Sequence, residues 1–506
     1  MSEHSQTMRS TINIHRAIGI RNKMLYGQFL EHFHRQIYGG IFDPKSSLSN
    51  GDGLREDVIE AIRKLNVPII RWPGGCFVSA YHWENGIGPH RESVFDKSWR
   101  VEEPNTFGTD GYIKLCRALG CDPYICTNAG TGTAEEMSNW VEYCNLDHEG
   151  RYAKMRISNG NRQPFGVKYW SIGNENWGSW EIGAKTREEW GHLVRESAKM
   201  IKRVDPSVEL SAAALPDVDW NLNLLRNCGD YLDWISIHQY WDAIHETNNA
   251  SKFEQVMALT SDLDANITKV RGLLEALGMQ DQIRIAFDEW NLREWYHPKA
   301  VTVEQGLTKD EYLTPRDDND INSLYTMADA VFSASVLNML HRNCQIVGMT
   351  CFSPMVNTRG CIFVHPQGIV LRPTYFVFDL YANHLGDVVL DDWSSNASTI
   401  EVSDATGHRV SIPALDILAT TWTDHRRVSV AVASHDKDHS HALELDIDGI
   451  EGTHDVTIFT LNGSSEEAYN DINHTQVVVT KHDLGAYRPG MPIQIEPHSV
   501  NIIEIV

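Results

Sequence analysis

Short strand-like segments alternate with helix-like segments along residues 24–386, and this alternation restricts the possible folds more than any other pattern in the chain. The strand-like segments are brief apolar runs, whereas the helix-like segments repeat apolar residues with helical periodicity. Such alternation predicts a parallel sheet, because a helix must carry the chain back before each new strand. Eight units predict a closed (β/α)8 barrel. The expected strands lie near residues 25–30, 67–75, 122–130, 167–175, 208–215, 231–241, 282–291 and 345–357.

An open, doubly wound parallel sheet is the alternative fold for the same alternation. Such a sheet usually carries a glycine-rich phosphate-binding turn after its first strand. Residues 20–29, IRNKMLYGQF, contain no G-x-G-x-x-G pattern. The closed barrel is therefore favoured.

After residue 386 the pattern changes to short alternating runs separated by Gly, Asp, Asn and Ser. Runs such as VSVAVAS and DVTIFTL are typical of an all-β sandwich or jelly roll. An alternating segment near the N-terminus, STINIHRAIGI, precedes the barrel without a helix partner, so we expect it to join this sandwich. The predicted domains are an N-terminal sandwich strand in 1–20, a catalytic barrel in 21–385 and a β-sandwich in 386–506.

Composition and charge argue against several classes of function. Asp and Glu number 68 against 44 Lys and Arg, which gives a net charge of −24. A chain this acidic repels phosphate backbones, so we expect no nucleic acid partner. Residues 1–19 contain no apolar core of a secretory signal, and no apolar run is long enough for a membrane span, so no membrane association is expected. The nine cysteines include no Cys-x-x-Cys pair, which indicates reduced thiols and a cytoplasmic location.

The segment KYWSIGNENWGSW, residues 168–180, places a carboxylate directly after a buried strand. Burying a carboxylate is costly unless it is paired, so Glu175 is expected to belong to a site rather than to a core. In (β/α)8 barrels the active site lies at the carboxyl ends of the strands. The polar residues expected there are Glu31, Arg71, Cys76, Asn174, Glu175, His238, Tyr240, Asp288, Glu289, Asn291, Asn357 and Arg359.

Two of these carboxylates, Glu175 and Glu289, are expected to face each other across the barrel mouth. Paired carboxylates with aromatic walls cleave glycosidic bonds, one acting as a protonated acid and the other as an ionised nucleophile. Arg71 and Tyr240 are suited to keep one of them ionised. Asp288 precedes Glu289 on the strand and is expected to point to the opposite face. Tryptophans placed to line the mouth are Trp72, Trp177, Trp180, Trp290 and Trp295.

Several candidates also have structural interpretations that the residues alone leave open. Glu31 could contact substrate or form a salt bridge with a nearby base. Arg71 could pack inside the barrel, and His238 could be a hydrogen-bonded core histidine. His32 and His34 would share one face of a strand, but no third ligand follows at a suitable spacing, so we expect no metal and no other cofactor.

Six motifs along the chain are similar to those of family 51 of the glycoside hydrolases, whose best-known members are α-L-arabinofuranosidases. The motifs occur in the family's order, and the resemblance covers the whole length of the chain. They are YGQFLEHFHRQIYGGIFD (26–43), RWPGGCFVSAYHWENGIGP (71–89), WSIGNENWG (170–178), SIHQYW (236–241), FDEWN (287–291) and MVNTRG (355–360).

The resemblance implies a retaining enzyme that releases non-reducing terminal α-L-arabinofuranosyl residues from arabinoxylan- or arabinan-derived oligosaccharides. It implies that Glu175 is the acid/base, that Glu289 is the nucleophile and that Asn174 binds the sugar 2-hydroxyl. It also implies a β-sandwich built from both chain ends and a homo-oligomer, either a hexamer or a trimer. The remaining substrate-binding candidates are Glu31, Arg71, Cys76, His238, Tyr240, Trp177, Trp290 and Asn357.

Three departures from the family pattern affect specificity rather than the catalytic pair. Cys76 follows RWPGG where many members have Asn, and a thiol is only a weak donor. Pro354 stands where other members have Gln, and the loop at 291–321 also differs. A β-xylosidase or endo-β-glucanase of the same family is therefore an alternative. A catalytically inactive carbohydrate-binding barrel is the alternative from another class.

Overall fold

The structure, a computed structural model, describes residues 7–241, 252–292, 320–403 and 409–506. Eight parallel strands form one sheet in the order β8-β7-β6-β3-β2-β11-β10-β9. A parallel bridge between Ala213 and Ser236 joins the end of β8 to β9, so the sheet is a nearly closed barrel and the expected fold class is confirmed. The strands are β2 (Gly27–Phe29), β3 (Ile69–Trp72), β6 (Asp122–Thr127), β7 (Tyr169–Ile172), β8 (Glu209–Ala212), β9 (Trp234–Trp241), β10 (Arg284–Leu292) and β11 (Val347–Phe352).

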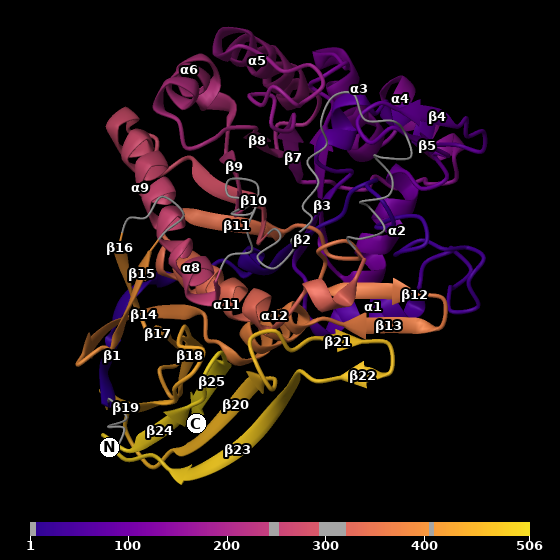
Figure 1. Cartoon of the computed structure of the whole chain (residues 1–506). Helices are drawn as coiled ribbons and strands as arrows, with labels where there is room; N and C mark the ends of the chain where they lie inside the picture. Colours follow the sequence, from indigo (N-terminus) through magenta and orange to yellow (C-terminus); the bar gives the residue numbers. More distant parts are fainter. Residues whose placement is uncertain (1–6, 242–251, 293–319, 404–408) are drawn as a thin grey trace.

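Helices follow the barrel strands and cover the outside of the sheet (Figure 1). Local sequence sets several of their ends. Thr186 and Glu189 form a capping box at the start of α5, and Gly120 ends α2 in the left-handed conformation. The helices are α1 (Glu56–Lys64), α2 (Thr109–Leu119), α3 (Ala134–Asn145), α4 (Gly150–Ser158), α5 (Arg187–Val204), α6 (Val218–Cys228), α8 (Phe253–Ala258), α9 (Thr260–Leu277), α11 (Met327–Arg342) and α12 (Pro373–His384).

The first barrel strand is shorter than expected. Lys23–Tyr26 form a 3-10 helix, and β2 covers only Gly27–Phe29 of the predicted strand. A Cβ at Gly27 would lie 2.3 Å from the carbonyl oxygen of Thr350 on β11, so this close approach requires glycine. The sequence patterns also missed two hairpins, namely β4 (Val94–Asp96) with β5 (Val101–Glu103) and β12 (Ile362–His365) with β13 (Gly368–Leu371).

A second sheet has nine strands in the order β23-β20-β25-β18-β17-β14-β1-β19-β24. β1 (Thr7–Ile20) pairs antiparallel with β14 (Val388–Ser395) and parallel with β19 (His441–Asp448). The two ends of the chain therefore lie in the same sheet. The other strands of this sheet are β17 (Leu415–Thr421), β18 (Val428–Ser434), β20 (Asp455–Asn462), β23 (Val478–Ala486), β24 (Pro492–Ile495) and β25 (Val500–Ile505). Two small antiparallel pairs accompany it, β15 (Thr399–Ser403) with β16 (Arg409–Pro413) and β21 (Asn470–Asp471) with β22 (His474–Thr475).

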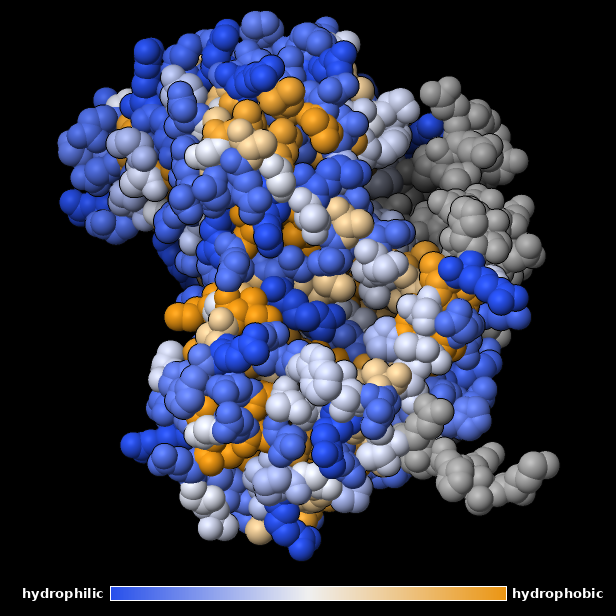
Figure 2. All heavy atoms as spheres, turned by 90° about the vertical axis from the view of Figure 1, so that its left-hand side faces the viewer, coloured by the Kyte–Doolittle hydropathy of each residue, from blue (hydrophilic) through white to orange (hydrophobic). Residues whose placement is uncertain are grey.

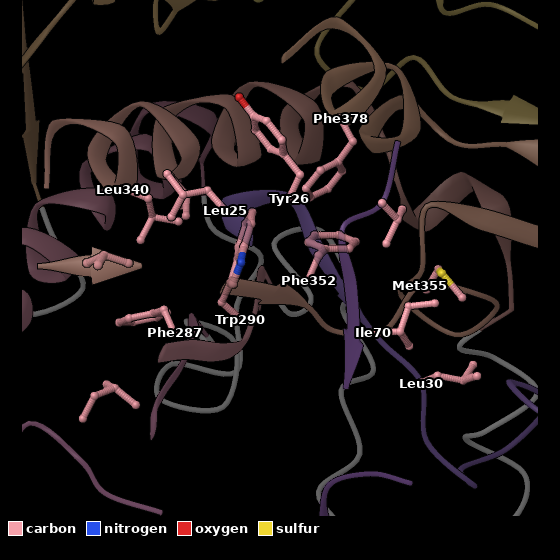
Figure 3. Packing of buried hydrophobic residues seen from close by; sticks show 14 of the residues in the cluster. Leu25, Tyr26, Leu30, Ile70, Phe287, Trp290, Leu340, Phe352, Met355 and Phe378 are labelled. Carbon is pink, nitrogen blue, oxygen red and sulfur yellow. The ribbon is translucent and has the colours of Figure 1, made fainter. Parts of the chain in front are cut away.

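Helices α11 and α12 lie between the barrel and the second sheet (Figure 1). One continuous apolar core runs from barrel residues through these helices, including Leu340 and Phe378, to Ala431 and Ile502 of the second sheet. Figure 3 shows the barrel side of this packing, and on the face shown in Figure 2 hydrophilic residues cover most of the surface. Among the described residues, no helix combines the length and apolarity of a membrane span.

Candidate active site

Glu175 occupies a sharp turn directly after β7. Its backbone has a φ of 43°, in the left-handed region that non-glycine residues rarely adopt. Gly173 makes the turn possible, because it has a φ of 71° and a Cβ there would lie 2.1 Å from Asn176 Oδ1. The N–H of Gly178 closes the turn by donating to the carbonyl oxygen of Glu175 at 2.7 Å. Backbone strain of this kind concentrates at functional sites.

The carboxylate of Glu175 binds two ring nitrogens. His238 Nδ1 lies 2.9 Å from its Oε1, and Trp180 Nε1 donates to its Oε2 at 3.0 Å. Burial lowers the pKa of His238, but Glu289, Asp288 and Glu175 outweigh this effect and raise the pKa to about 10. His238 is therefore an imidazolium at neutral pH, held among carboxylates, and the interpretation as a plain core histidine is wrong.

Glu289 projects from β10 and is held by two donors. Arg71 Nη1 donates to Oε1 at 2.5 Å, and the Tyr240 hydroxyl donates to Oε2 at 2.8 Å. Arg71 is fully buried, and its Nη2 also donates to Asn174 Oδ1 at 2.9 Å. Arg71 thus connects Glu289 with the residue before Glu175, which a plain packing role does not explain. The Tyr240 hydroxyl also lies 2.7 Å from Ser353 Oγ on the other side of the site.

Asp288 does not point away from the site, as alternation along the strand predicted. The register of β10 shifts between Ala286 and Glu289, so two successive carboxylates turn toward the barrel interior. Asp288 accepts hydrogen bonds of 2.6 Å from Tyr124 and from Ser236, and it lies 3.4 Å from Arg71 Nε. Its Oδ1 also lies 3.3 Å from His238 Nε2. Asp288 therefore lies within ion-pair distance of both cationic side chains of the site, Arg71 and His238.

Glu175 and Glu289 lie close together although 114 residues separate them in the chain. One oxygen of each carboxylate and one nitrogen of His238 all lie within 4.8 Å of one another. Retaining glycosidases hold their carboxyl groups about 5–5.5 Å apart, whereas inverting enzymes leave about 6.5–9.5 Å for a water molecule. The spacing in this barrel is shorter than that of the second class.

Glu31 lies beside this pair at the end of β2. Its Oε1 accepts hydrogen bonds from Phe77 N–H at 3.1 Å and from Trp99 Nε1 at 3.0 Å. Burial and the nearby Glu289 raise its pKa to about 8. Among the described residues no base lies within ion-pair distance of Glu31, so the expected salt bridge is not formed within that part of the chain. Gly74 belongs to its cradle, because a Cβ there would lie 2.5 Å from Glu31 Cγ.

Cys76 and Asn174 meet a residue that the sequence did not single out, Glu181. Asn174 Nδ2 lies 3.4 Å from Glu181 Oε2, and one oxygen of Glu181 lies within 4.8 Å of both Cys76 Sγ and an oxygen of Glu175. Glu181 is 4% exposed, and burial together with the charges of Glu175 and Glu289 raises its pKa to about 7. The half-buried Cys76 thus lies in the site, at the start of the 3-10 helix Cys76–Ala80.

Two predicted substrate contacts are wrong. Trp290 is fully buried, and it packs in the core against Phe352 and Phe378 (Figure 3). The shifted register of β10 turns its ring toward the helices rather than toward the mouth. Asn357 is also fully buried, where its side chain donates to the carbonyl oxygen of Arg35 at 2.6 Å and accepts from Val364 N–H at 2.8 Å. Asn357 therefore secures a turn and does not face substrate.

The tryptophans after Glu175 divide into a wall and a packing residue. Trp180 is 61% exposed and donates to Glu175, whereas Trp177 is partly buried and stacks edge-on against it at 5.1 Å. Trp72 is fully buried and donates to His32, so it does not line the mouth. Trp295 and most of the loop at 291–321 lie outside the described residues.

Sequence reasoning missed four residues that hold the site together. Two come from loops, one lies inside β6 and one directly follows the end of β11. Glu181 could have been noticed, because it is a second carboxylate in an aromatic loop. The four residues are Trp99, Tyr124, Glu181 and Ser353.

A nearly closed (β/α)8 barrel with two carboxylates side by side at its mouth defines the molecule as a glycosidase. Comparison with known proteins specifies the kind. Two family models match, the α-L-arabinofuranosidase 1 domain over residues 61–258 and the α-L-arabinofuranosidase C-terminal domain over residues 288–499. The chain belongs to the α-L-arabinofuranosidases of glycoside hydrolase family 51.

Individual relatives agree with this assignment. The probable α-L-arabinofuranosidase C of Aspergillus clavatus is 33% identical over 501 residues, covering 94% of this chain and 93% of that protein. The intracellular exo-α-(1→5)-L-arabinofuranosidase of Halalkalibacterium halodurans is 30% identical over 480 residues, covering 92% of each chain. The crystal structure of an α-L-arabinofuranosidase from Thermotoga maritima in complex with arabinose matches with a TM-score of 0.86 and 32% identity, covering 99% of this chain and 100% of that one.

Proposed function

We propose that this enzyme releases non-reducing terminal α-L-arabinofuranosyl residues from short arabinan- or arabinoxylan-derived oligosaccharides, with retention of configuration at C1. The close approach of Glu175 and Glu289, with one oxygen of each within 4.8 Å, carries the proposal. A relative named for exo-α-(1→5) activity supports exo action on such chains. Substrate recognition would use Glu31, Cys76 and Asn174 around the sugar, with Trp180 as an exposed wall.

In the first step a Glu289 carboxylate oxygen attacks C1, and the bond from C1 to the leaving oxygen breaks. Arg71 and Tyr240 hold the attacking carboxylate in place by hydrogen bonds of 2.5 and 2.8 Å. Glu175 gives its proton to the leaving oxygen. His238 Nδ1, 2.9 Å from Glu175 Oε1, donates a hydrogen bond that stabilises the Glu175 carboxylate left after the proton has gone.

In the second step Glu175 takes a proton from water, and the water oxygen attacks C1. The ester bond between C1 and Glu289 breaks, so both carboxyl groups return to their starting states. The released arabinose keeps the configuration of the substrate. Proton NMR of the first product formed would show the α anomer, whereas the β anomer would contradict the mechanism.

Replacing the two carboxylates tests their roles separately. Glu175→Ala and Glu289→Ala should each lower turnover of an aryl α-L-arabinofuranoside by at least ~100-fold. With azide, Glu289→Ala should yield the β-azide, because azide enters on the face the nucleophile has left. Glu175→Ala should yield the α-azide by intercepting the glycosyl-enzyme.

Glu196→Ala on the exposed side of α5 is the matched control and should keep full activity. Unchanged turnover in both site variants would refute the assignment. Cleavage of β-xylosides or β-glucans in preference to α-L-arabinofuranosides would refute the substrate class. Tight binding of an arabino-oligosaccharide by the wild type without any cleavage would point to a sugar-binding barrel instead.

We further propose that the enzyme acts inside the cell as a homo-oligomer, a hexamer or a trimer. The Halalkalibacterium halodurans relative is named intracellular, which supports the location. Cell fractionation with an antibody tests the location. Light scattering coupled to size-exclusion chromatography tests the assembly, and a monomer at micromolar concentration would contradict it.

A further inference from the structure

We propose that Cys76, Glu175 and Glu181 form a binding site for one thiophilic divalent cation of the zinc type, and that occupation of this site inhibits the enzyme. One ligand atom from each of the three residues lies within 4.8 Å of the other two. The ligands are a sulfur and two carboxylate oxygens, a set that zinc accepts, at distances of about 2.3 Å to sulfur and about 2.0–2.2 Å to oxygen. The inhibitory consequence rests on the proposed acid/base role of Glu175.

Glu181 supplies the independent observation that points to a ligand. Its carboxylate is 4% exposed, and its Oε1 accepts no hydrogen bond from any described residue. Burying a carboxylate oxygen without a hydrogen-bond donor costs free energy in the unbound protein. A ligand that contacts this oxygen removes that cost, which favours binding. The other oxygen receives only a 3.4 Å contact from Asn174.

The charges around the cluster favour a cation. Asp288, Glu289 and Glu175 already engage the two cationic side chains of the site, Arg71 and His238. Within the described part of the chain, no Lys, Arg or His lies within ion-pair distance of Glu181 or of Glu31. The side of the site that holds Cys76 therefore carries two carboxyl groups without an ion-pair partner among the described residues, and a bound cation would favour their ionised forms.

A second trio at the mouth is a poorer cation site. Glu175, His238 and Glu289 also lie within 4.8 Å of one another. Both nitrogens of His238 are already engaged, however, Nδ1 with Glu175 and Nε2 with Ser236 and Asp288. A cation there would have to displace these contacts, whereas Glu181 Oε1 accepts no hydrogen bond from a described residue.

The site also predicts which cations bind. Zinc and cadmium prefer sulfur with a small number of ligands, whereas calcium and magnesium require six or more oxygens. Binding would release the thiol proton, so each cation exchanges for one proton at Cys76. A cation on Glu175 occupies the oxygen that must carry the proton for the leaving group, and it lies where the sugar would sit.

Isothermal titration of the full-length enzyme with ZnCl₂ in a non-chelating buffer tests the binding. We expect a Cys76- and Glu181-dependent site filled by one zinc per chain, with weak or no binding of MgCl₂. Cys76→Ser and Glu181→Gln should each weaken that zinc site by at least ~100-fold, as expected for the loss of a direct ligand. Cys121→Ser changes a half-buried thiol at the end of α2 and is the matched control.

Cobalt provides a readout that surface histidines do not mimic. Co²⁺ bound to the wild type and to Cys121→Ser should show a thiolate-to-cobalt charge-transfer band in the near ultraviolet, and Cys76→Ser should lack it. Absence of this band, or zinc affinity equal in wild type, Cys76→Ser and Glu181→Gln, would overturn the site. Zinc should inhibit hydrolysis competitively with substrate, and EDTA should restore activity.

The result also separates this proposal from the proposed function. If zinc binds through Cys76 and Glu181 but hydrolysis is unaffected, the inhibitory part falls and the acid/base role of Glu175 is called into question. If zinc does not bind through these residues while Glu175→Ala is still inactive, only the cation site is refuted.

Discussion

Two buried histidines, one at the barrel mouth and one under the second sheet, have opposite charge states. His238 at the mouth has its pKa raised to about 10, because three carboxylates outweigh the effect of burial. His341 on α11 has its pKa lowered to about 3 by burial and by the charge of Arg21. Its ring binds the Tyr26 hydroxyl at 2.9 Å and the carbonyl oxygen of Leu337 at 2.6 Å.

The contrast shows that partners, not depth, set the charge of a buried group. At the mouth Arg71, His238 and Asp288 stay ionised because each lies beside groups of opposite charge. At the interface between the barrel and the second sheet several buried pairs are neutral and hydrogen-bonded, for example His435 with Ser335 at 2.7 Å and Tyr381 with Asn338 at 2.8 Å. Removing one member of each region should therefore have different consequences.

The largest difference in unfolding free energy is expected when one arginine is replaced in each region. Arg71→Met leaves Asp288 and Glu289 buried without their cation, which should lower the free energy of unfolding by about 3–5 kcal/mol and abolish most activity. Arg342→Met breaks the 2.9 Å pair with the buried Asp416 near the interface, but the arginine side chain is 29% exposed, so the cost should be smaller, about 1–2 kcal/mol. Urea denaturation measures both, and equal costs would break the comparison.

The two histidines should change the free energy of unfolding at opposite ends of the pH range. The native pKa of His341, about 3, lies below its ordinary value of 6.5, so the unfolded chain binds the extra proton as pH falls. This group alone then removes about 1.4 kcal/mol of stability per pH unit between these values. His341→Gln should flatten the fall in stability below pH 6.5, as measured by urea denaturation at several pH values.

His238 should affect the pH dependence of stability at alkaline rather than acid pH. Its native pKa, about 10, lies above the ordinary value of 6.5, so its stabilisation is complete below pH 6.5 and is lost as pH rises toward 10. His238→Gln should flatten the alkaline limb of the stability curve, whereas His341→Gln should leave that limb as in the wild type. An alkaline limb unchanged by His238→Gln, or flattened by His341→Gln, would refute the opposite charge states.

The sequence predicted the barrel well because its evidence is local and repeated. Each strand–helix unit carries its own periodicity, so an error at one boundary, as at Gly27, leaves the count unchanged. The positions of Glu175, Glu289 and Arg71 followed from a rule about strand ends that needs no knowledge of side-chain direction.

Side-chain direction is what the sequence could not provide. Alternation placed Asp288 on the wrong face and Trp290 in the mouth, because a register shift in β10 is a property of the pairing with β9 and β11. Asn357 was misassigned for a similar reason, since its partners come from a distant loop and a hairpin. Glu181 and Trp99 reach the site from loops, which no periodicity describes.

The smallest expected effects compare two tyrosines that each lose one hydroxyl. Tyr240→Phe removes a hydrogen bond to the ionised Glu289, worth about 1.5 kcal/mol, so kcat/KM should fall roughly 10-fold while stability changes little. Tyr381→Phe removes a neutral bond to Asn338 at the interface, so the free energy of unfolding should fall by about 1 kcal/mol while kcat/KM stays unchanged. Steady-state kinetics and urea denaturation of both variants complete the test. Because the two substitutions delete the same atom, a loss of stability without a loss of rate in Tyr240→Phe would mean that its hydroxyl only packs the mouth.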